Sequence, residues 1–415
     1  MREETRRWLQ DDWSHSWHPF TDQEQWEGID SPVLVKGEGV YLYDSEGRRY
    51  FDGNSSIWTN IHGHCHPRLV EAIRAQAGEL CHCSYLGLAH ARASELSARL
   101  CRAAGLERCF FSDNGSTAIE AALRMELQWR LQNGEKERRE FVAFENGYHG
   151  DTLGAASLGG VGRFFTSIAG LGPKVSLART VEDLEAMNPA GIAAVVIEPL
   201  IQGVNEMRSW PAGMLREIRA WCTKHEVHLI LDEVMTGFGR TGKLFACQVE
   251  EVIPDYLCVA KGLTGGTMPL AATLTSDEIY RCFKGEGNTF YYGHSYTANP
   301  LGCAAALASL DLCEEEGFIE GVQEKGALMG TWLQELESKA RVKEVRRCGM
   351  VVGIELNGNS LSPGEVGREV CVRLREGGML TRPILDTVVW MPPLVSSEAE
   401  LEEMMELLVC GISLG

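Results

Sequence analysis

Two ionisable side chains follow two short apolar segments near the middle of the chain. Asp232 comes directly after the segment 227–231, and Lys261 directly after the segment 256–260. Short apolar runs that stop at glycine-rich turns are typical of buried strands in a parallel sheet, and ligands collect at the carboxyl ends of such strands. A lysine amine placed there can form a Schiff base with a carbonyl group, and a nearby carboxylate can keep a ring nitrogen protonated. The pair therefore points to an enzyme that uses pyridoxal 5′-phosphate (PLP).

A turn in the first third of the chain is a candidate phosphate site. We expect a strand at 109–111, a turn rich in glycine and hydroxyl groups at 112–117, and a helix at 118–131. A glycine turn that opens a helix offers free backbone N–H groups, which bind anions. Gly115 and Ser116 are therefore predicted to hold a phosphate group, with Thr117 as a further candidate. Ser116 also suits the role of a helix N-cap, and the two roles are compatible.

The segments around Asp232 and Lys261 resemble those of the class III aminotransferases, a branch of the fold-type I PLP-dependent transferases. The matching strings are D-E-V at 232–234, T-G-F-G-R-T-G at 236–242 and A-K-G at 260–262. The resemblance extends over nearly the whole chain. It implies an α/β fold with a mostly parallel seven-stranded sheet in a large domain and a small α+β domain beside it. It also implies a homodimer whose active sites are shared between the subunits.

The resemblance assigns catalytic and cofactor-binding roles to individual residues. Lys261 would hold PLP and act as general base, and Asp232 would keep the ring nitrogen protonated. Tyr148 would lie flat on the ring, opposite Val234, and the hydroxyl group of Ser295 would reach the phosphate held by the neighbouring subunit. The implied catalytic residues are Lys261, Asp232 and Tyr148. The implied cofactor-binding residues are Gly115, Ser116, Tyr148, Asp232, Val234, Lys261 and Ser295.

Substrate contacts follow from the same resemblance. Arg382 would pair with a substrate carboxylate, because a guanidinium group makes a bidentate fork with that group. Trp58 would wall the substrate tunnel, and Asp151 would tie down a substrate amine or brace its own loop. The implied substrate-binding residues are Trp58, Phe20, Asp151, Arg240, Arg382, Gly293 and His294.

Four strings are most similar to the branch of this family that works in biotin biosynthesis. They are W-x-P-F-T at 17–21, D-G-x-S-S-x-W at 52–58, G-F-G-R-T-G-K-L-F-A-C at 237–247 and K-G-L-T-G-G at 261–266. That branch transfers an amino group to 8-amino-7-oxononanoate and forms 7,8-diaminononanoate. The resemblance therefore implies this keto compound as the amino acceptor.

Two departures from that branch leave the amino donor open. Members that use S-adenosylmethionine have tyrosine at the position of Phe20 and a Trp-Trp pair where this chain has Ile57 and Trp58. Losing a hydroxyl group and an aromatic face weakens a site built to stack on adenine and a sulfonium. A variant of the same enzyme that uses L-lysine carries residues like those of this chain. Both S-adenosylmethionine and L-lysine are therefore candidate donors.

Three other functions compete with this interpretation. A class III ω-aminotransferase of another pathway (diamine, 4-aminobutyrate or ornithine type) would keep every catalytic residue and change only the tunnel. An aminomutase of the same fold would need no external donor. A metal-binding protein would use the run H-G-H-C-H at 62–66. Zinc ligands are usually spaced by two or more residues so that their side chains converge, so we expect no metal site.

Composition and charge indicate which partners and which cellular compartment to expect. The chain of 415 residues has 39 basic and 58 acidic residues, giving a net charge of −19, which argues against nucleic acid as a partner. The 14 cysteines are scattered, often within apolar runs, where a thiol behaves as a small hydrophobe. Neither an apolar leader nor a stretch long enough to span a membrane is visible. We therefore expect a cytoplasmic protein with no membrane partner.

The chain is expected to form two domains, one of them discontinuous in sequence. We assign 1–60 to the amino-terminal part of the small domain, 61–315 to the large PLP-binding domain and 316–415 to the carboxy-terminal part of the small domain. Alternation of apolar and polar residues, broken at glycines, predicts an antiparallel meander over 33–53. A strand at 379–383 is expected to join the small-domain sheet.

Overall fold

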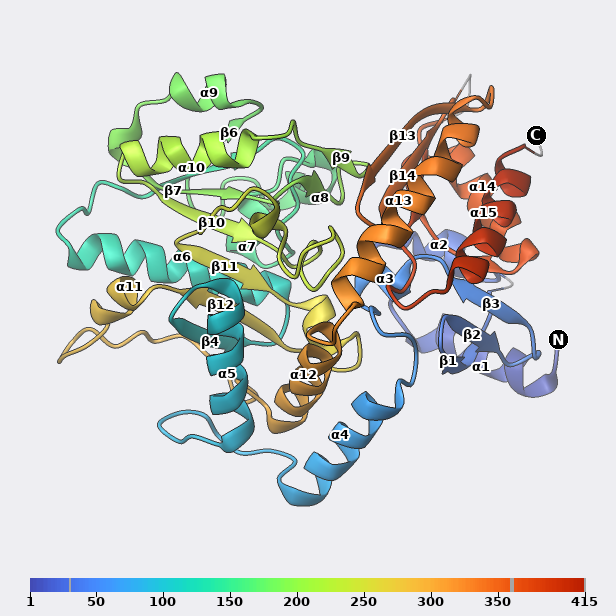
Figure 1. The fold of residues 1–415 in the computed structure, drawn as a ribbon, viewed down its shortest axis with the longest axis horizontal. Helices are drawn as coiled ribbons and strands as arrows, with labels where there is room; N and C mark the ends of the chain where they lie inside the picture. Colours follow the sequence, from blue (N-terminus) through green and yellow to red (C-terminus); the bar gives the residue numbers. More distant parts are fainter. Residues whose placement is uncertain (30, 359–361, 414–415) are drawn as a thin grey trace.

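The computed structural model describes residues 1–29, 31–358 and 362–413, and a seven-stranded sheet lies within its left-hand part in Figure 1. The strand order is β4-β12-β11-β10-β7-β5-β6, and only β12 runs antiparallel to its neighbours. This confirms the predicted α/β fold with a mostly parallel seven-stranded sheet. The strands are β4 (Arg108–Ser112), β5 (Glu140–Phe144), β6 (Val175–Ala178), β7 (Ile192–Ile197), β10 (His228–Asp232), β11 (Tyr256–Val259) and β12 (Ala271–Thr275).

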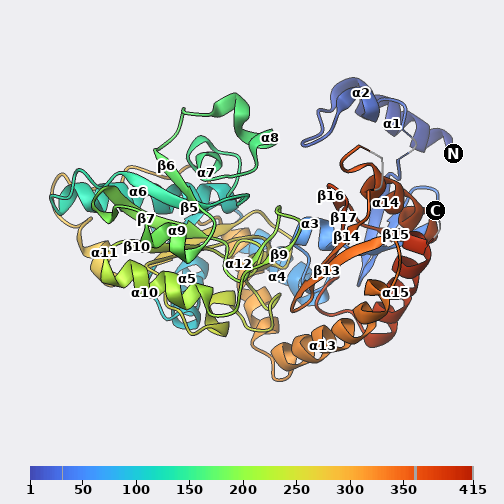
Figure 2. The same cartoon turned by 90° about the horizontal axis from the view of Figure 1, so that it is seen from above.

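Helices cover both faces of this sheet (Figure 2). The helices α6 (Gly115–Gln132) and α7 (Leu153–Ser157) pack on one face, and α5 (Ala91–Ala104) and α10 (Met214–Lys224) pack on the other. Every residue of β7 and β11 is buried. Strands covered on both faces read as continuous apolar runs, so polar side chains gather at their ends.

The rest of the chain forms two four-stranded sheets beside the large one. The first has the order β1-β2-β3-β15 and the second β13-β14-β17-β16. The meander expected over 33–53 is present as the first three of these strands. The strands are β1 (Leu34–Glu38), β2 (Tyr41–Asp44), β3 (Arg49–Asp52), β13 (Val342–Cys348), β14 (Val351–Leu356), β15 (Met379–Leu380), β16 (Pro383–Ile384) and β17 (Thr387–Trp390).

The single strand expected at 379–383 is divided between the two small sheets. β15 pairs in parallel with β3, whereas β16 pairs antiparallel with β17. Proline at 383 has no N–H group to donate to a continued ladder, so the chain leaves the first sheet before it. The division into domains at about residues 60 and 315 remains a prediction.

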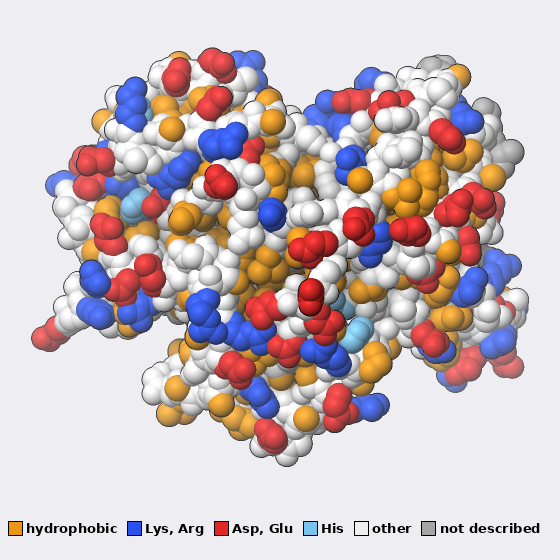
Figure 3. Space-filling model, viewed as in Figure 1, with side chains coloured by type: hydrophobic (Ala, Val, Ile, Leu, Met, Phe, Trp, Pro, Cys, Tyr) orange, Lys and Arg blue, Asp and Glu red, His pale blue; other side chains and the backbone are white. Residues whose placement is uncertain are grey.

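The remaining helices connect the strands and pack beside the sheets. Within the described residues, no helix combines the length and the apolar character that crossing a bilayer requires. Acidic and basic side chains are interspersed over the face shown in Figure 3. The remaining α-helices are α1 (Glu3–His15), α2 (Gln23–Trp26), α3 (Ser55–Trp58), α4 (Pro67–Glu79), α8 (Gly162–Phe165), α9 (Val181–Glu185), α11 (Asp277–Arg281), α12 (Pro300–Cys313), α13 (Phe318–Glu337), α14 (Glu365–Gly377) and α15 (Glu398–Ser413). Short connecting elements are η1 (Thr166–Ile168), η2 (Pro189–Gly191), η3 (Ala246–Val249), η4 (Lys261–Thr264) and the hairpin of β8 (Ile201–Gln202) and β9 (Arg208–Ser209).

Candidate active site

A cavity of about 130 Å³ lies at the carboxyl ends of the central strands. Asp232 is the last residue of β10, and Lys261 opens η4 just after the parallel neighbour β11. Seven of the residues predicted from the sequence meet in this cavity: Trp58, Gly115, Ser116, Tyr148, Asp232, Val234 and Lys261. The other lining residues are His149, Gly150, Glu198 and Met235.

Lys261 lies against an aromatic ring and feels the charges of two carboxylates. Its Nζ atom is 4.5 Å from the centre of the Trp58 ring. Burial, only partly opposed by the negative charges of Asp232 and Glu198, lowers the pKa of Lys261 from 10.5 to about 8. The backbone of Lys261 is in the left-handed region, with φ of 42°. A lysine with this pKa holds a substantial neutral fraction near pH 8, as a nucleophile or general base requires.

Asp232 is held by a histidine that the sequence reasoning did not select. Nδ1 of His149 lies 2.8 Å from Oδ2 of Asp232, and the N–H of Val234 donates to Oδ1 at 3.1 Å. Burial acts to lower the pKa of His149, but the hydrogen bond to Asp232 and the charges of Asp232 and Glu198 outweigh it and raise that pKa. His149 follows Tyr148 in the sequence, and this adjacency was the only signal that could have identified it.

Glu198 is a second residue that the sequence reasoning left without a role in the site. It directly follows β7 and accepts hydrogen bonds from the N–H groups of Tyr148 (3.1 Å) and Gly203 (2.9 Å). Burial raises the pKa of Glu198 to about 7. Glu198 therefore links the β8–β9 hairpin to the loop that contains Tyr148.

Tyr148 and Ser116 are tied together through Asp151. The hydroxyl group of Tyr148 donates to Oδ2 of Asp151 at 2.8 Å, and the N–H of Asp151 donates to Oγ of Ser116 at 3.0 Å. Burial raises the pKa of Tyr148. Asp151 is exposed, and its contact with a substrate amine remains a prediction.

The amino terminus of α6 opens into the cavity. Its N-cap is Asn114, whose side chain accepts from the N–H of Thr117 at 3.0 Å, so the expectation that Ser116 caps this helix is wrong. A Cβ atom on Gly115 would lie 2.6 Å from Cγ1 of Val234, so only glycine fits here without a shift. Backbone N–H groups at the start of this 18-residue helix form a site suited to an anion.

Two predicted arginines lie outside the cavity lining. Arg240 is fully buried, and its guanidinium group donates to the carbonyl oxygens of Pro392 (2.5 Å) and Asn60 (3.2 Å). Burial lowers the pKa of Arg240 to about 9. Arg382 is exposed, between β15 and β16. Their contacts with substrate remain predictions.

The other predicted residues outside the cavity lining lie on exposed segments of the chain. The side chain of Phe20 is 57% exposed, between α1 and α2. Gly293 and Ser295 are exposed, and Nδ1 of His294 lies 3.4 Å from Oδ2 of Asp113. The structure of a single chain thus leaves the expected role of Ser295, in the site of a neighbouring subunit, as a prediction.

The run of histidines at 62–66 has three separate sets of partners. Nε2 of His62 lies 3.1 Å from Oγ of Ser309, and Nε2 of His64 lies 2.8 Å from Oδ2 of Asp52. The ring of His66 caps α4. Among the described residues, no group of three His, Cys, Asp or Glu side chains is placed to hold a metal ion.

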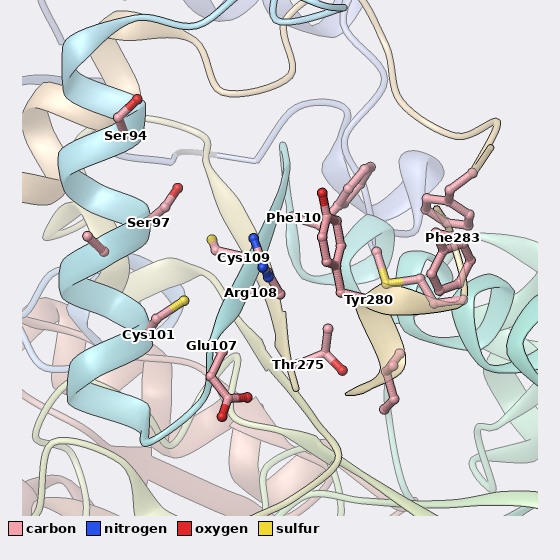
Figure 4. Close-up of a pocket in the computed structure, with 14 residues that line it drawn as sticks. Ser94, Ser97, Cys101, Glu107, Arg108, Cys109, Phe110, Thr275, Tyr280 and Phe283 are labelled. Carbon is pink, nitrogen blue, oxygen red and sulfur yellow. The ribbon is translucent and has the colours of Figure 1, made fainter. Parts of the chain in front are cut away.

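A larger cavity, of about 490 Å³, lies between α5, β4 and α11 (Figure 4). Its walls include Phe110, Phe283 and Tyr280, with Cys101 and Cys109 on the side of α5 and β4. It contains none of the residues predicted to act on substrate or cofactor. Cavity size therefore does not identify the active site in this protein, whereas the convergence of ionisable groups does.

Comparisons with known proteins agree with this geometry. Residues 25–411 match the family model described as aminotransferase class III. A protein of Nitratidesulfovibrio vulgaris named adenosylmethionine-8-amino-7-oxononanoate aminotransferase is 42% identical, covering 94% of this chain and 79% of its own. A protein of the same name from Geobacter sulfurreducens is 40% identical over 94% of both chains.

Solved structures give the same family. The crystal structure of adenosylmethionine-8-amino-7-oxononanoate aminotransferase from Methanocaldococcus jannaschii superposes with a TM-score of 0.95 at 36% identity, covering 98% of this chain and 99% of that chain. A PLP-bound amine transaminase from an uncultivated Pseudomonas species gives a TM-score of 0.91 at 31% identity, covering 96% and 98% of the two chains.

The residues of the cavity fit PLP. An amine of lowered pKa suits the aldehyde, a buried carboxylate suits the protonated ring nitrogen, and the start of α6 suits the phosphate. The tight approach of Gly115 to Val234 brings the phosphate end and the ring end of such a ligand into one continuous site. The fold, the site and the relatives agree, and the chain belongs to the class III aminotransferases, a family of PLP-dependent enzymes.

Proposed function

We propose that this aminotransferase converts 8-amino-7-oxononanoate to 7,8-diaminononanoate in biotin biosynthesis. The observation that carries the proposal is the agreement in name among relatives from distant lineages. Proteins of Nitratidesulfovibrio vulgaris, Staphylococcus aureus and Methanocaldococcus jannaschii, 34–42% identical over at least 94% of this chain, are all named for that acceptor. The strings at 52–58 and 261–266 support the same branch of the family.

The chain contributes positioning and proton transfer to this reaction. Bound PLP supplies an aldehyde carbonyl and a ring that accepts electrons when its nitrogen is protonated. Asp232, oriented by His149, keeps that nitrogen protonated. Lys261 takes the proton from the donor carbon at its neutral Nζ atom and later returns a proton to the acceptor carbon. Tyr148 and Val234, which both line the cavity, would hold the ring.

For the amino donor we propose S-adenosylmethionine, because the relatives carry that compound in their names. L-Lysine is the second candidate, and Phe20 and Ile57 favour it, since these side chains offer neither the hydroxyl group nor the second indole of the S-adenosylmethionine-using members. Both donors require the same Lys261 chemistry. An experiment that distinguishes the two donors therefore identifies the amino donor and leaves the assignment of PLP unaffected.

The experiment is a visible spectrum of the purified holoenzyme with each donor added separately. Wild-type protein is expected to show a yellow band that S-adenosylmethionine bleaches and 8-amino-7-oxononanoate then restores. Bleaching by L-lysine alone would replace the proposed donor. If neither donor bleaches the band, the biotin-pathway assignment fails while PLP binding stands. Lys261→Ala is the control, because it removes the amine and should show neither a bleachable band nor turnover.

We further propose a cytoplasmic homodimer in which Ser295 serves the active site of the neighbouring subunit. All 14 cysteines, each among the described residues, are free thiols, which supports a reducing compartment. The exposure of Ser295 and of Tyr296, 60% of whose side chain is accessible, leaves this segment available to a second chain.

Mixing two inactive variants tests the shared site. A Lys261→Ala chain and a Ser295→Asp chain, each inactive alone, should regain activity when they form mixed dimers, because one site then has Lys261 and a partner's intact Ser295. If Ser295 serves the site of its own chain, mixing restores nothing. A monomer by light scattering would also overturn the proposal.

A further inference from the structure

The segment α3 is a left-handed turn of four consecutive residues that are not glycine. Ser55, Ser56, Ile57 and Trp58 have φ values of 44°, 47°, 65° and 69°. In this conformation Cβ lies too close to the following carbonyl oxygen, and for a β-branched residue such as Ile57 it is a true outlier. Backbone held in such a state persists only where surrounding contacts impose it, and these places cluster at functional sites.

The carboxylate of Asp52 makes two of the contacts that hold this turn, and Oγ of Ser55 donates a further bond to the carbonyl oxygen of Met391 at 2.7 Å. Oδ1 of Asp52 accepts from the N–H of Ser56 at 2.8 Å, and Oδ2 accepts from Oγ of Ser56 at 2.8 Å. Nε2 of His64 lies 2.8 Å from the same Oδ2. The side chain of Asp52 is only 3% exposed, so solvent does not compete for these bonds.

His64 in turn is fixed by the backbone. Its N–H and carbonyl groups pair with those of Gly39, at 2.6 Å and 3.1 Å. A Cβ atom on Gly37 would lie 2.8 Å from Cβ of His64, so the ring lies directly against β1. The carboxylate of Asp52 is thus set in place by a rigid part of the small sheet and not by the turn that it holds.

The left-handed turn places Trp58 in the active-site cavity. The indole N–H of Trp58 donates to Oδ1 of Asn54 at 2.9 Å, and its ring centre is 4.5 Å from Nζ of Lys261. The ring also lies near the β8–β9 hairpin, since a Cβ atom on Gly203 would lie 3.1 Å from it. A right-handed or extended segment would direct this indole elsewhere.

We propose that Asp52, braced by His64, is a positioning residue for the active site, because it imposes the left-handed turn that presses Trp58 against Lys261. This proposal rests on the proposed role of Lys261. A positioning role for Asp52 differs from a purely structural role in its consequence. The loss of Asp52 should alter the environment of Lys261 and not only the stability of the fold.

The test compares Asp52→Asn with Asp44→Asn in the holoenzyme. Asp44 is a matched control on the neighbouring strand β2, 5% exposed, and it accepts from the N–H groups of Glu46 and Arg48 and from the hydroxyl group of Tyr50. Both variants are expected to lower the midpoint of thermal unfolding. Only Asp52→Asn should shift the pH midpoint of the visible absorbance and lower kcat/KM, on the order of 10- to 100-fold for a displaced active-site group.

A double-mutant cycle with Trp58→Ala shows whether Asp52 acts through Trp58. In the Trp58→Ala background, Asp52→Asn should produce no further shift of the absorbance midpoint, although it still lowers the unfolding temperature. If Asp52→Asn does not fold, Ser56→Ala replaces it, since it removes one bond to Asp52 and keeps the backbone bond.

Three results would overturn the proposal. They are an unshifted midpoint in the folded variant, an equal shift in Asp44→Asn, and a full additional shift in the Trp58→Ala background. Absence of a visible band in wild-type protein would instead refute the role of Lys261. The two failures are therefore distinguishable.

Discussion

Nδ1 of His149 lies 2.8 Å from Oδ2 of Asp232, and both residues are at least 95% buried. The second oxygen of Asp232 accepts from the backbone of Val234. The carboxylate expected to hold the cofactor ring therefore has a fixed orientation before any ligand arrives. Such preorganisation removes the cost of reorienting it during the reaction.

Replacing His149 should weaken catalysis without removing a catalytic residue. A hydrogen bond to a charged group contributes about 1.5–3 kcal/mol, so His149→Leu should lower kcat roughly 10- to 100-fold. His149→Asn is the matched control, because its amide N–H can take the position of Nδ1 and donate to Asp232. Steady-state kinetics of the two variants distinguish them, and equal activities would contradict the role.

The same histidine should make stability depend on pH. Its pKa is raised in the folded protein above the ordinary value of 6.5. The folded state therefore keeps a proton that the unfolded chain releases, so this stabilisation is complete below about pH 6.5 and is lost as pH rises through the folded pKa. Thermal unfolding midpoints measured from pH 6 upward should fall less steeply in His149→Leu than in wild type.

Lys261 should react as an amine of low basicity. Its pKa of about 8 means that in the cofactor-free protein its labelling by an amine reagent rises with pH around 8 and not near 10.5. Asp232→Asn removes a charge that favours the protonated amine, so the midpoint should move lower still. Mass spectrometry of the Lys261 peptide measures this, with the remaining lysines as internal reference. A midpoint above 10 would contradict the burial argument.

Gly115→Ala should lower the affinity for PLP. The new Cβ atom would lie 2.6 Å from Cγ1 of Val234, and overpacking of this kind costs about 1–3 kcal/mol. If that strain falls on the bound state, Kd rises roughly tenfold. Titration of the cofactor-free protein with PLP measures Kd. Adding Val234→Ala makes room for the methyl group, so the double variant should bind more tightly than Gly115→Ala alone.

The left-handed turn predicts an inverted preference between glycine and alanine. At Ile57, with φ of 65°, glycine should stabilise the protein relative to alanine by about 1 kcal/mol. At Glu71, an exposed position in the right-handed helix α4, the order should reverse by a similar amount. Thermal or denaturant unfolding of the four variants provides the comparison. The same order at both positions would rule out the left-handed conformation.

Local sequence patterns were sufficient to predict the strands that end at Asp232 and precede Lys261. Apolar runs bounded by glycines and covered on both faces have a strong signature, and parallel strands bring their carboxyl ends together. The contact between Asp232 and His149 could not be predicted from local patterns. His149 follows β5 and Asp232 ends β10, and their contact depends on β7 lying between those strands. Sheet order is a long-range property that local spacing does not encode.

The left-handed conformation of α3 could not be predicted from the sequence either. Nothing in Ser55, Ser56 and Ile57 favours a left-handed backbone, and a β-branched residue opposes it. The bonds from Asp52 override this local preference, as tertiary contacts do at strained functional sites. The resemblance to known aminotransferases drew attention to Trp58 but not to the backbone that positions it.

The parallel pairing of β3 with β15 has a consequence for synthesis of the chain. Phe51 lies beside Met379, so the first sheet gains its fourth strand only after more than three hundred further residues have been made. During synthesis, the edge of β3 that later pairs with β15 stays unpaired while the strands of the central sheet are made. This late pairing places Leu380 beside Asp52, the residue that bonds to the turn carrying Trp58. Maturation of the catalytic site therefore depends on a strand that the ribosome makes long after the meander that this strand completes.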